Sequence, residues 1–202
     1  MDAEDLSRRS LLQFIAAALG AVALPAGWAE IAQASQEAHA ASQLPGKARL
    51  SFLSAAEAAD VEAVAAQIIP TNDTPGARDA GVVYFIDRAL ATFLSRLAGD
   101  YRAQLGEFQV TFRGRHPNAA SFAALTSAEQ IDYLKTVDGT PFFDTTRLLT
   151  ILGMFSMPAY GGNRNGAGWK LIGFEDRHSF QPPFGYYDRD YPGFTDDHSR
   201  RP

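Results

Sequence analysis

Apolar residues recur every three or four positions through most of the chain from Ser54 to Met157, in stretches that proline or glycine residues end. This spacing places the apolar side chains on one face of a helix, whereas a strand would require apolar and polar residues to alternate. No alternating stretch is long enough to build a sheet, and the chain has no internal repeat. We therefore expect an all-α protein with a single helical domain.

Three of the expected helices begin with a capping signal. Two signals are Ser/Thr-x-x-Glu capping boxes, in which each side chain bonds an unpaired amide of the first turn. The third is a Thr-Pro pair, because proline is favoured at the first helical position. The signals are Ser54 with Glu57, Thr126 with Glu129, and Thr140 with Pro141. We expect the corresponding helices over residues 54–69, 126–137 and 142–157.

Two further helices fill the interval between these. Apolar spacing predicts one helix over residues 80–97 and another from Tyr101, with Gly99-Asp100 separating them. The helix expected over 142–157 is apolar nearly all the way round, which is typical of a helix that is buried or covered by a partner.

The character of the chain changes after Pro158. Residues 160–170 are rich in glycine and polar residues, and the final stretch is aromatic and rich in proline and glycine, without any period. We therefore expect the helical domain to span residues 51–174 and an irregular Gly/Pro/aromatic C-terminal arm to span residues 175–202.

The N-terminus has the pattern of an export signal. Arg8-Arg9 precedes an uncharged, alanine-rich stretch, and Ala32-Gln33-Ala34 forms a small-x-small site for a signal peptidase. We interpret residues 1–34 as a twin-arginine signal peptide and residues 35–50 as a flexible leader. Two alternatives stay open: an amphipathic N-terminal helix that merely begins with two arginines, and a signal that is retained as a membrane anchor.

Composition excludes several classes of function. The chain has no cysteine, so it cannot hold a disulfide, a thiolate nucleophile, an iron–sulfur cluster or a covalently attached c-type haem. Its net charge is −5 and no dense cluster of Lys and Arg occurs, so we do not expect nucleic acid as a partner.

We also expect no catalytic residue, bound cofactor or metal site in this chain. The glycines of residues 161–168 fit neither a phosphate loop nor a dinucleotide-binding fingerprint. The four histidines are too far apart in the sequence to form a helical metal-binding pair: His39, His116, His178 and His198. Three aspartates do not fit the spacing of a calcium loop, and we expect them to cap or to lie at the surface: Asp73, Asp79 and Asp87.

Two segments resemble the motifs of a known family. Residues Ile68–Val82, continuing to Asp87, resemble the opening motif of the gluconate 2-dehydrogenase subunit 3 family, and residues Tyr160–Phe174 resemble its second motif. The resemblance covers roughly residues 50–188, and the twin-arginine signal agrees with it.

The resemblance implies the non-catalytic small subunit of a membrane-associated dehydrogenase that oxidises a sugar, a polyol or an aldonate. It implies a large partner subunit that binds FAD and performs the chemistry, and often a c-type cytochrome subunit that carries haem. It also implies that the small subunit bears the export signal, brings the large subunit through the twin-arginine translocase, and supports its maturation and stability. The expected location is the periplasm, at the outer face of the cytoplasmic membrane.

An apolar last helix and an aromatic arm provide more apolar surface than the core of a small domain needs, which is typical of a binding face. We expect the partner interface to include Tyr160, Gly161, Gly162, Asn163, Trp169, Phe184, Tyr186 and Tyr187. The alternative is that Trp169 and the tyrosines fold back over the helices of their own domain. Two other functions stay open: a stand-alone extracytoplasmic binding or scaffold protein, and an autonomous extracytoplasmic enzyme.

Overall fold

The computed structural model describes residues 50–176, and this part of the chain is helical and contains no β-strand. The prediction of an all-α domain is therefore confirmed for these residues. The α-helices are α3 (Ala55–Ile68), α4 (Val82–Ala91), α5 (Ser95–Arg115), α6 (Ser127–Thr136), α7 (Pro141–Phe155) and α8 (Ala167–Leu171). Three short 3₁₀ helices lie between them: η1 (Phe122–Ala124), η2 (Pro158–Tyr160) and η3 (Arg164–Gly166). Within the described range, no helix is long and apolar enough to cross a membrane.

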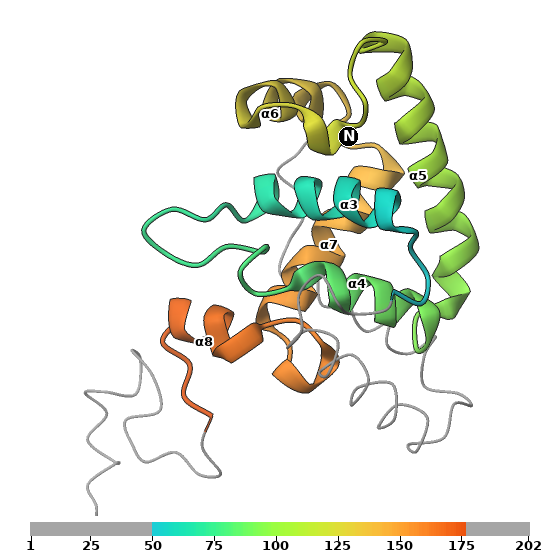
Figure 1. Cartoon of the computed structure of the whole chain (residues 1–202). Helices are drawn as coiled ribbons and strands as arrows, with labels where there is room; N and C mark the ends of the chain where they lie inside the picture. Colours follow the sequence, from blue (N-terminus) through green and yellow to red (C-terminus); the bar gives the residue numbers. More distant parts are fainter. Residues whose placement is uncertain (1–49, 177–202) are drawn as a thin grey trace, which may run out of the picture.

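Helix α7 forms the centre of the domain. It passes behind α3 and α4, while α5 runs along one side, and α6 and α8 lie at opposite ends (Figure 1). The core between these helices is apolar, and its most deeply buried side chains include Val61, Val64, Ile86, Leu90, Leu105, Leu149 and Met154. Most of the circumference of α7 is buried or half-buried, as its apolar sequence indicates, but Ile151 remains exposed.

The capping signals form as predicted. The Ser54 hydroxyl accepts a hydrogen bond from the Glu57 amide (3.3 Å), and the Glu57 carboxylate accepts one from the Ser54 amide (2.8 Å). Thr126 and Glu129 make the same reciprocal pair at the start of α6. Thr140 caps α7, where its hydroxyl accepts from an amide of the first turn. Local sequence therefore determines where α3, α6 and α7 begin.

The helix predicted over residues 80–97 is confirmed for Val82–Ala91, but its predicted end is wrong, because the chain breaks earlier and Gly99 lies inside the next helix. Helix α4 ends where Thr92 leaves the helical region (φ −129°, ψ −102°) and its hydroxyl donates to the carbonyl of Arg88. Helix α5 then begins at Ser95 and continues through Gly99. A glycine inside a helix costs about 1 kcal/mol relative to alanine, which the burial of residues such as Leu105 on the inner face of α5 offsets.

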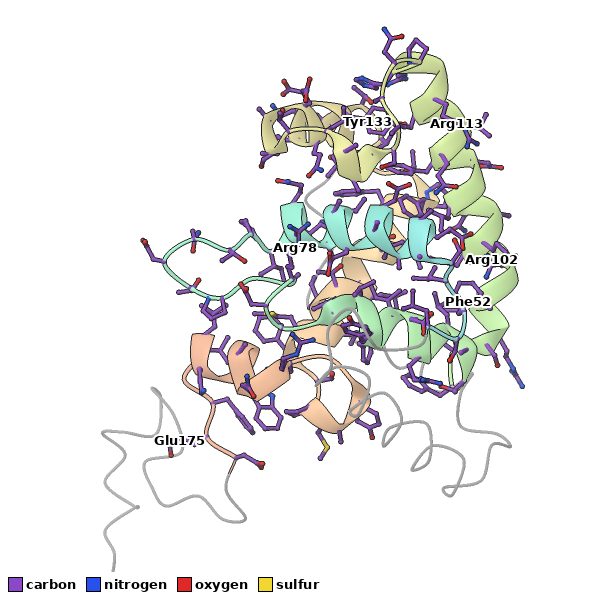
Figure 2. All side chains as sticks on the ribbon, in the orientation of Figure 1. Phe52, Arg78, Arg102, Arg113, Tyr133 and Glu175 are labelled. Atoms are coloured by element: carbon purple, nitrogen blue, oxygen red, sulfur yellow. The ribbon has the colours of Figure 1, made fainter. Side chains whose placement is uncertain are left out.

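The segment that leads into α3 is bound to α4 by one buried carboxylate. Asp87 accepts hydrogen bonds from the amides of Ser51 (2.8 Å), Phe52 (2.9 Å) and Leu53 (2.8 Å). The prediction that Asp87 caps a helix or lies at the surface is wrong, because its carboxylate is buried and bonds amides that precede the N-cap of α3. Arg102 of α5 reinforces the segment, since its guanidinium carbon lies 4.3 Å from the centre of the Phe52 ring. Figure 2 shows these two side chains together at the edge of α5.

Replacing Asp87 by alanine leaves three backbone amides without an acceptor. We expect Asp87→Ala to lower the free energy of unfolding by about 3 kcal/mol, because hydrogen bonds to charged groups contribute more than neutral ones and buried unsatisfied donors are costly. Urea unfolding followed by circular dichroism measures the difference.

Asp132→Ala is the matched control, since Asp132 forms only an exposed ion pair with Lys135. An exposed pair contributes little, so the control should change stability by less than about 0.5 kcal/mol. Equal effects of the two substitutions would contradict a structural role for Asp87.

Candidate partner-binding surface

Asp79 organises the loop of the first motif, between α3 and α4. Its carboxylate accepts hydrogen bonds from the hydroxyl of Thr71 and from the amide of Gly76 (3.0 Å). The Thr71 hydroxyl, and then the Gly76 amide, lower the pKa of Asp79, so the side chain stays ionised as the loop requires. Asn72 adds a second local bond, since its side-chain oxygen accepts from the amide of Thr74 (3.1 Å). The polar residues of this motif therefore build the loop itself.

The structure does not gather acidic residues into a metal site. Asp79 holds the loop before α4, while Asp87 binds the amides before α3. Across residues 50–176, no group of three His, Asp or Glu side chains is arranged to hold a metal ion.

The glycine-rich loop of the second motif packs directly against the backbone of α7. A Cβ atom on Gly162 would lie 2.1 Å from the carbonyl oxygen of Gly153, and one on Gly168 would lie 1.9 Å from that of Met154. Both distances are far shorter than any van der Waals contact, so only glycine fits at these two positions. The loop can approach α7 this closely because it has no side chains there.

Asn163 joins the two ends of this loop from inside. It is fully buried, and its backbone adopts the left-handed conformation (φ 46°) that Asn tolerates better than most residues. Its side-chain amide donates to the carbonyl of Ser156 (2.8 Å), and its side-chain oxygen accepts from the amide of Gly168 (2.8 Å). Asn163 therefore links the end of α7 to the start of α8.

The two sequence motifs meet at the N-terminus of α4. The backbone amide of Arg164, in the second motif, donates to the carbonyl of Ala80, in the first (3.0 Å). Gly81 is the N-cap of α4 and has a positive φ of 66°. A Cβ atom on Gly81 would lie 2.8 Å from Nη2 of Arg164, so the glycine also leaves room for the guanidinium.

Two aromatic residues expected at the interface contact their own domain. The indole N–H of Trp169 donates to the carbonyl of Phe155 (2.9 Å), and its ring lies 5.1 Å from that of Phe174. Tyr160 packs edge-on against Phe93, with ring centres 6.1 Å apart. Trp169 and Tyr160 are only half-buried, so each contacts its own helices and keeps part of its ring exposed. A role for both in partner binding stays a prediction.

The other expected interface residues fall into two groups. Gly161, Gly162 and Asn163 are buried, so in this structure they shape the loop beneath the surface. The export arginines and the aromatic residues of the arm lie outside the described residues: Arg8, Arg9, Phe184, Tyr186 and Tyr187.

Large apolar side chains that the sequence analysis did not single out are exposed on α7, at the end of α8 and in the segments that follow these helices. Met157 and Ile172 are 57% and 59% exposed. We call the whole set the α7–α8 face, and it comprises Ile151, Met157, Leu171, Ile172 and Phe174. One sequence signal could have indicated it: Leu171, Ile172 and Phe174 are too closely spaced in a short, glycine-flanked segment for all of them to face inward.

The close contact between the loop and α7 predicts a contrast between two glycines. Gly168→Ala should lower the free energy of unfolding by about 3 kcal/mol, because its methyl group collides with a backbone carbonyl that cannot move aside cheaply. Gly106→Ala on α5 is the control, since no atom lies within 4 Å of its Cβ position. It should stabilise the chain by about 0.5–1 kcal/mol. Thermal and urea unfolding of the two variants measure the contrast, and destabilisation of equal size would refute the packing role of Gly168.

Comparison with known proteins agrees with this arrangement. The model of the gluconate 2-dehydrogenase subunit 3 family matches residues 55–176, which include both motif loops and every α-helix described above. No curated protein and no solved structure matches the chain. The matched range is more than half of the 202 residues. The chain therefore belongs to the gluconate 2-dehydrogenase subunit 3 family, that of an accessory subunit of a dehydrogenase complex.

Proposed function

We propose that this chain is the non-catalytic small subunit of a flavin-dependent sugar, polyol or aldonate dehydrogenase. It binds a large subunit that holds FAD, and a c-type cytochrome subunit with haem receives the electrons. It carries the twin-arginine signal for the complex, which works in the periplasm at the outer face of the cytoplasmic membrane. It also supports the maturation and stability of the large subunit. The observation that carries the proposal is the family match over the whole helical domain.

The buried acidic groups of the domain support a structural role for this chain. Asp60 is buried, and its carboxylate accepts from the amide of Ala123 (3.0 Å) and from the side chain of Gln109 (2.9 Å). Asp87 is occupied by the three amides before α3. Both carboxylates therefore hold helices and loops together, which fits a subunit that leaves the chemistry to its partner.

The α7–α8 face is the surface through which we propose that the large subunit binds. Exposed apolar side chains often belong to a binding site, because their burial removes apolar area from water. The half-exposed rings of Tyr160 and Trp169 belong to the same loop and helix and extend this surface. Phe184, Tyr186 and Tyr187 of the arm, which follow it in the sequence, complete the proposed interface.

Co-purification with the large subunit tests this surface. An Ile172→Asp substitution places a charge at the most exposed residue of the α7–α8 face, where desolvating it opposes binding. We expect the variant to lose at least 90% of the co-purifying flavoprotein, on the order of a 1.4 kcal/mol loss in binding. The readout is the flavin absorbance that is retained with a tagged small subunit.

Val110→Asp provides the matched control. Val110 is an apolar side chain with 63% exposure on α5, away from α8. This variant should retain flavoprotein at the level of the unmodified chain. If neither variant loses flavoprotein, the large subunit binds elsewhere, and if the unmodified chain retains none, the subunit role itself fails.

Export tests the role of the N-terminus. Replacing both Arg8 and Arg9 by lysine keeps the charge but removes the paired arginines that a twin-arginine receptor reads. We expect both this chain and the large subunit to accumulate in the cytoplasm. Fractionation followed by immunoblotting measures the distribution, and periplasmic accumulation of either protein at normal levels would contradict the export role.

A further inference from the structure

Arg164 occupies a position that its own domain does not explain. It is the one cation among residues 158–168, and its backbone is fixed by the bond from its amide to the carbonyl of Ala80 (3.0 Å). Its guanidinium lies over Gly81, as the short distance from Nη2 to the Cβ position of that glycine shows. The side chain therefore crosses the N-terminus of α4.

Two of the three guanidinium nitrogens lack a partner there. Nε and Nη2 of Arg164 are buried and form no hydrogen bond. Among residues 50–176, no carboxylate forms an ion pair with Arg164. The ring of Tyr84 is a favourable neighbour, and its centre lies 5.8 Å from the guanidinium carbon. Buried polar groups in folded proteins nearly always have partners, so two unpaired donors on one cation require an explanation.

The N-terminus of α4 makes the position of the Arg164 guanidinium electrostatically less favourable. The N-terminus of a helix carries a partial positive charge, so it attracts anions and repels cations. A positive side chain laid across it raises the local potential, and one weak contact with an aromatic ring offsets only part of that cost. An apolar side chain of similar shape would suit the isolated domain better, since it would need neither hydrogen bonds nor a counter-ion.

An anion would balance the positive charge of Arg164 beside the N-terminus of α4. A carboxylate matches the fork of an Arg guanidinium in both charge and geometry, and the start of α4 adds the field of its dipole. Arg164 as a whole is only partly buried, so an incoming group can reach its exposed part from the solvent side. Nε and Nη2 are themselves buried, and they pair with that group when the guanidinium turns toward it. The loop that holds it runs directly into α8, which bears Leu171 and leads to Ile172 of the α7–α8 face.

We propose that Arg164 binds a carboxylate of the large subunit when the two chains associate. The inference rests on the proposed function, which supplies the partner. It adds a charged anchor at the edge of the apolar interface, where Arg residues often account for much of the binding free energy. Gly81 contributes by leaving the space into which the guanidinium fits.

Substitution of Arg164 by methionine tests the proposal, with two measurements on the full chain. The first is thermal unfolding of the chain alone, and the second is its Kd for the large subunit at low and high salt. We expect Arg164→Met to unfold at the same temperature as the unmodified chain or at a higher one, and to raise Kd at least tenfold at low salt. Arg164→Lys, which keeps the charge without the fork, should raise Kd to an intermediate value.

Arg113→Met is the matched control, because Arg113 is an exposed cation on α5, far from α8 (Figure 2). It should change neither the unfolding temperature nor Kd. If Arg164→Met lowers the unfolding temperature of the chain alone, the arginine is structural and the proposal is overturned, whatever happens to Kd. An unchanged Kd also overturns it.

A further arm identifies the source of the anion. Acetate and phosphate are titrated into the unmodified chain and into Arg164→Met while the unfolding temperature is followed. If either anion stabilises only the unmodified chain and Arg164→Met still binds the large subunit normally, the site holds a free anion and not a partner carboxylate. Loss of binding by the unmodified chain would instead refute the subunit role, so the two failures are distinguishable.

Discussion

The domain depends on a contact between two stretches of backbone. Gly162 and Gly168 bring the loop after α7 against the carbonyls of Gly153 and Met154, at distances that leave no room for a Cβ atom. Asn163 then fixes the loop by bonding both ends of it. Because α8 follows this loop at once, the same contact sets the position of α8, of Trp169 and of the apolar side chains exposed beside them. A surface built in this way is held by main chain and does not rely on flexible side chains.

Local sequence predicted much of the fold, because helix starts depend on residues three or four positions apart. The capping boxes at Ser54 and Thr126 lie where the sequence places them. The boundary after α4 was missed, because Gly99 looks like a helix end but tolerates a helix once packing compensates for its cost. Burial of Asp87 was missed as well, since its partners lie about 35 positions away in the chain. Contacts between residues so far apart in the chain leave no periodic pattern in the sequence.

The sequence indicated the right segment for the candidate partner-binding surface, but it did not indicate which residues of that segment are exposed. The glycine-rich segment was expected at the interface, but Gly161, Gly162 and Asn163 are buried and support the surface from below. The exposed residues of the α7–α8 face follow the loop in sequence, and only the three-dimensional structure shows which side chains face outward. Arg164 gave no sequence signal at all, because an unpaired donor is visible only when every neighbour is placed.

The carboxylate of Asp87 has a mechanical consequence for the start of the domain. It accepts hydrogen bonds from three consecutive backbone amides, those of Ser51, Phe52 and Leu53, which precede the first turn of α3. A tension applied from the N-terminal side acts on these three bonds before it reaches α3, so they must break before α3 can unravel from its N-terminal end. The three bonds therefore protect the helices that follow from a pull on the chain before residue 50.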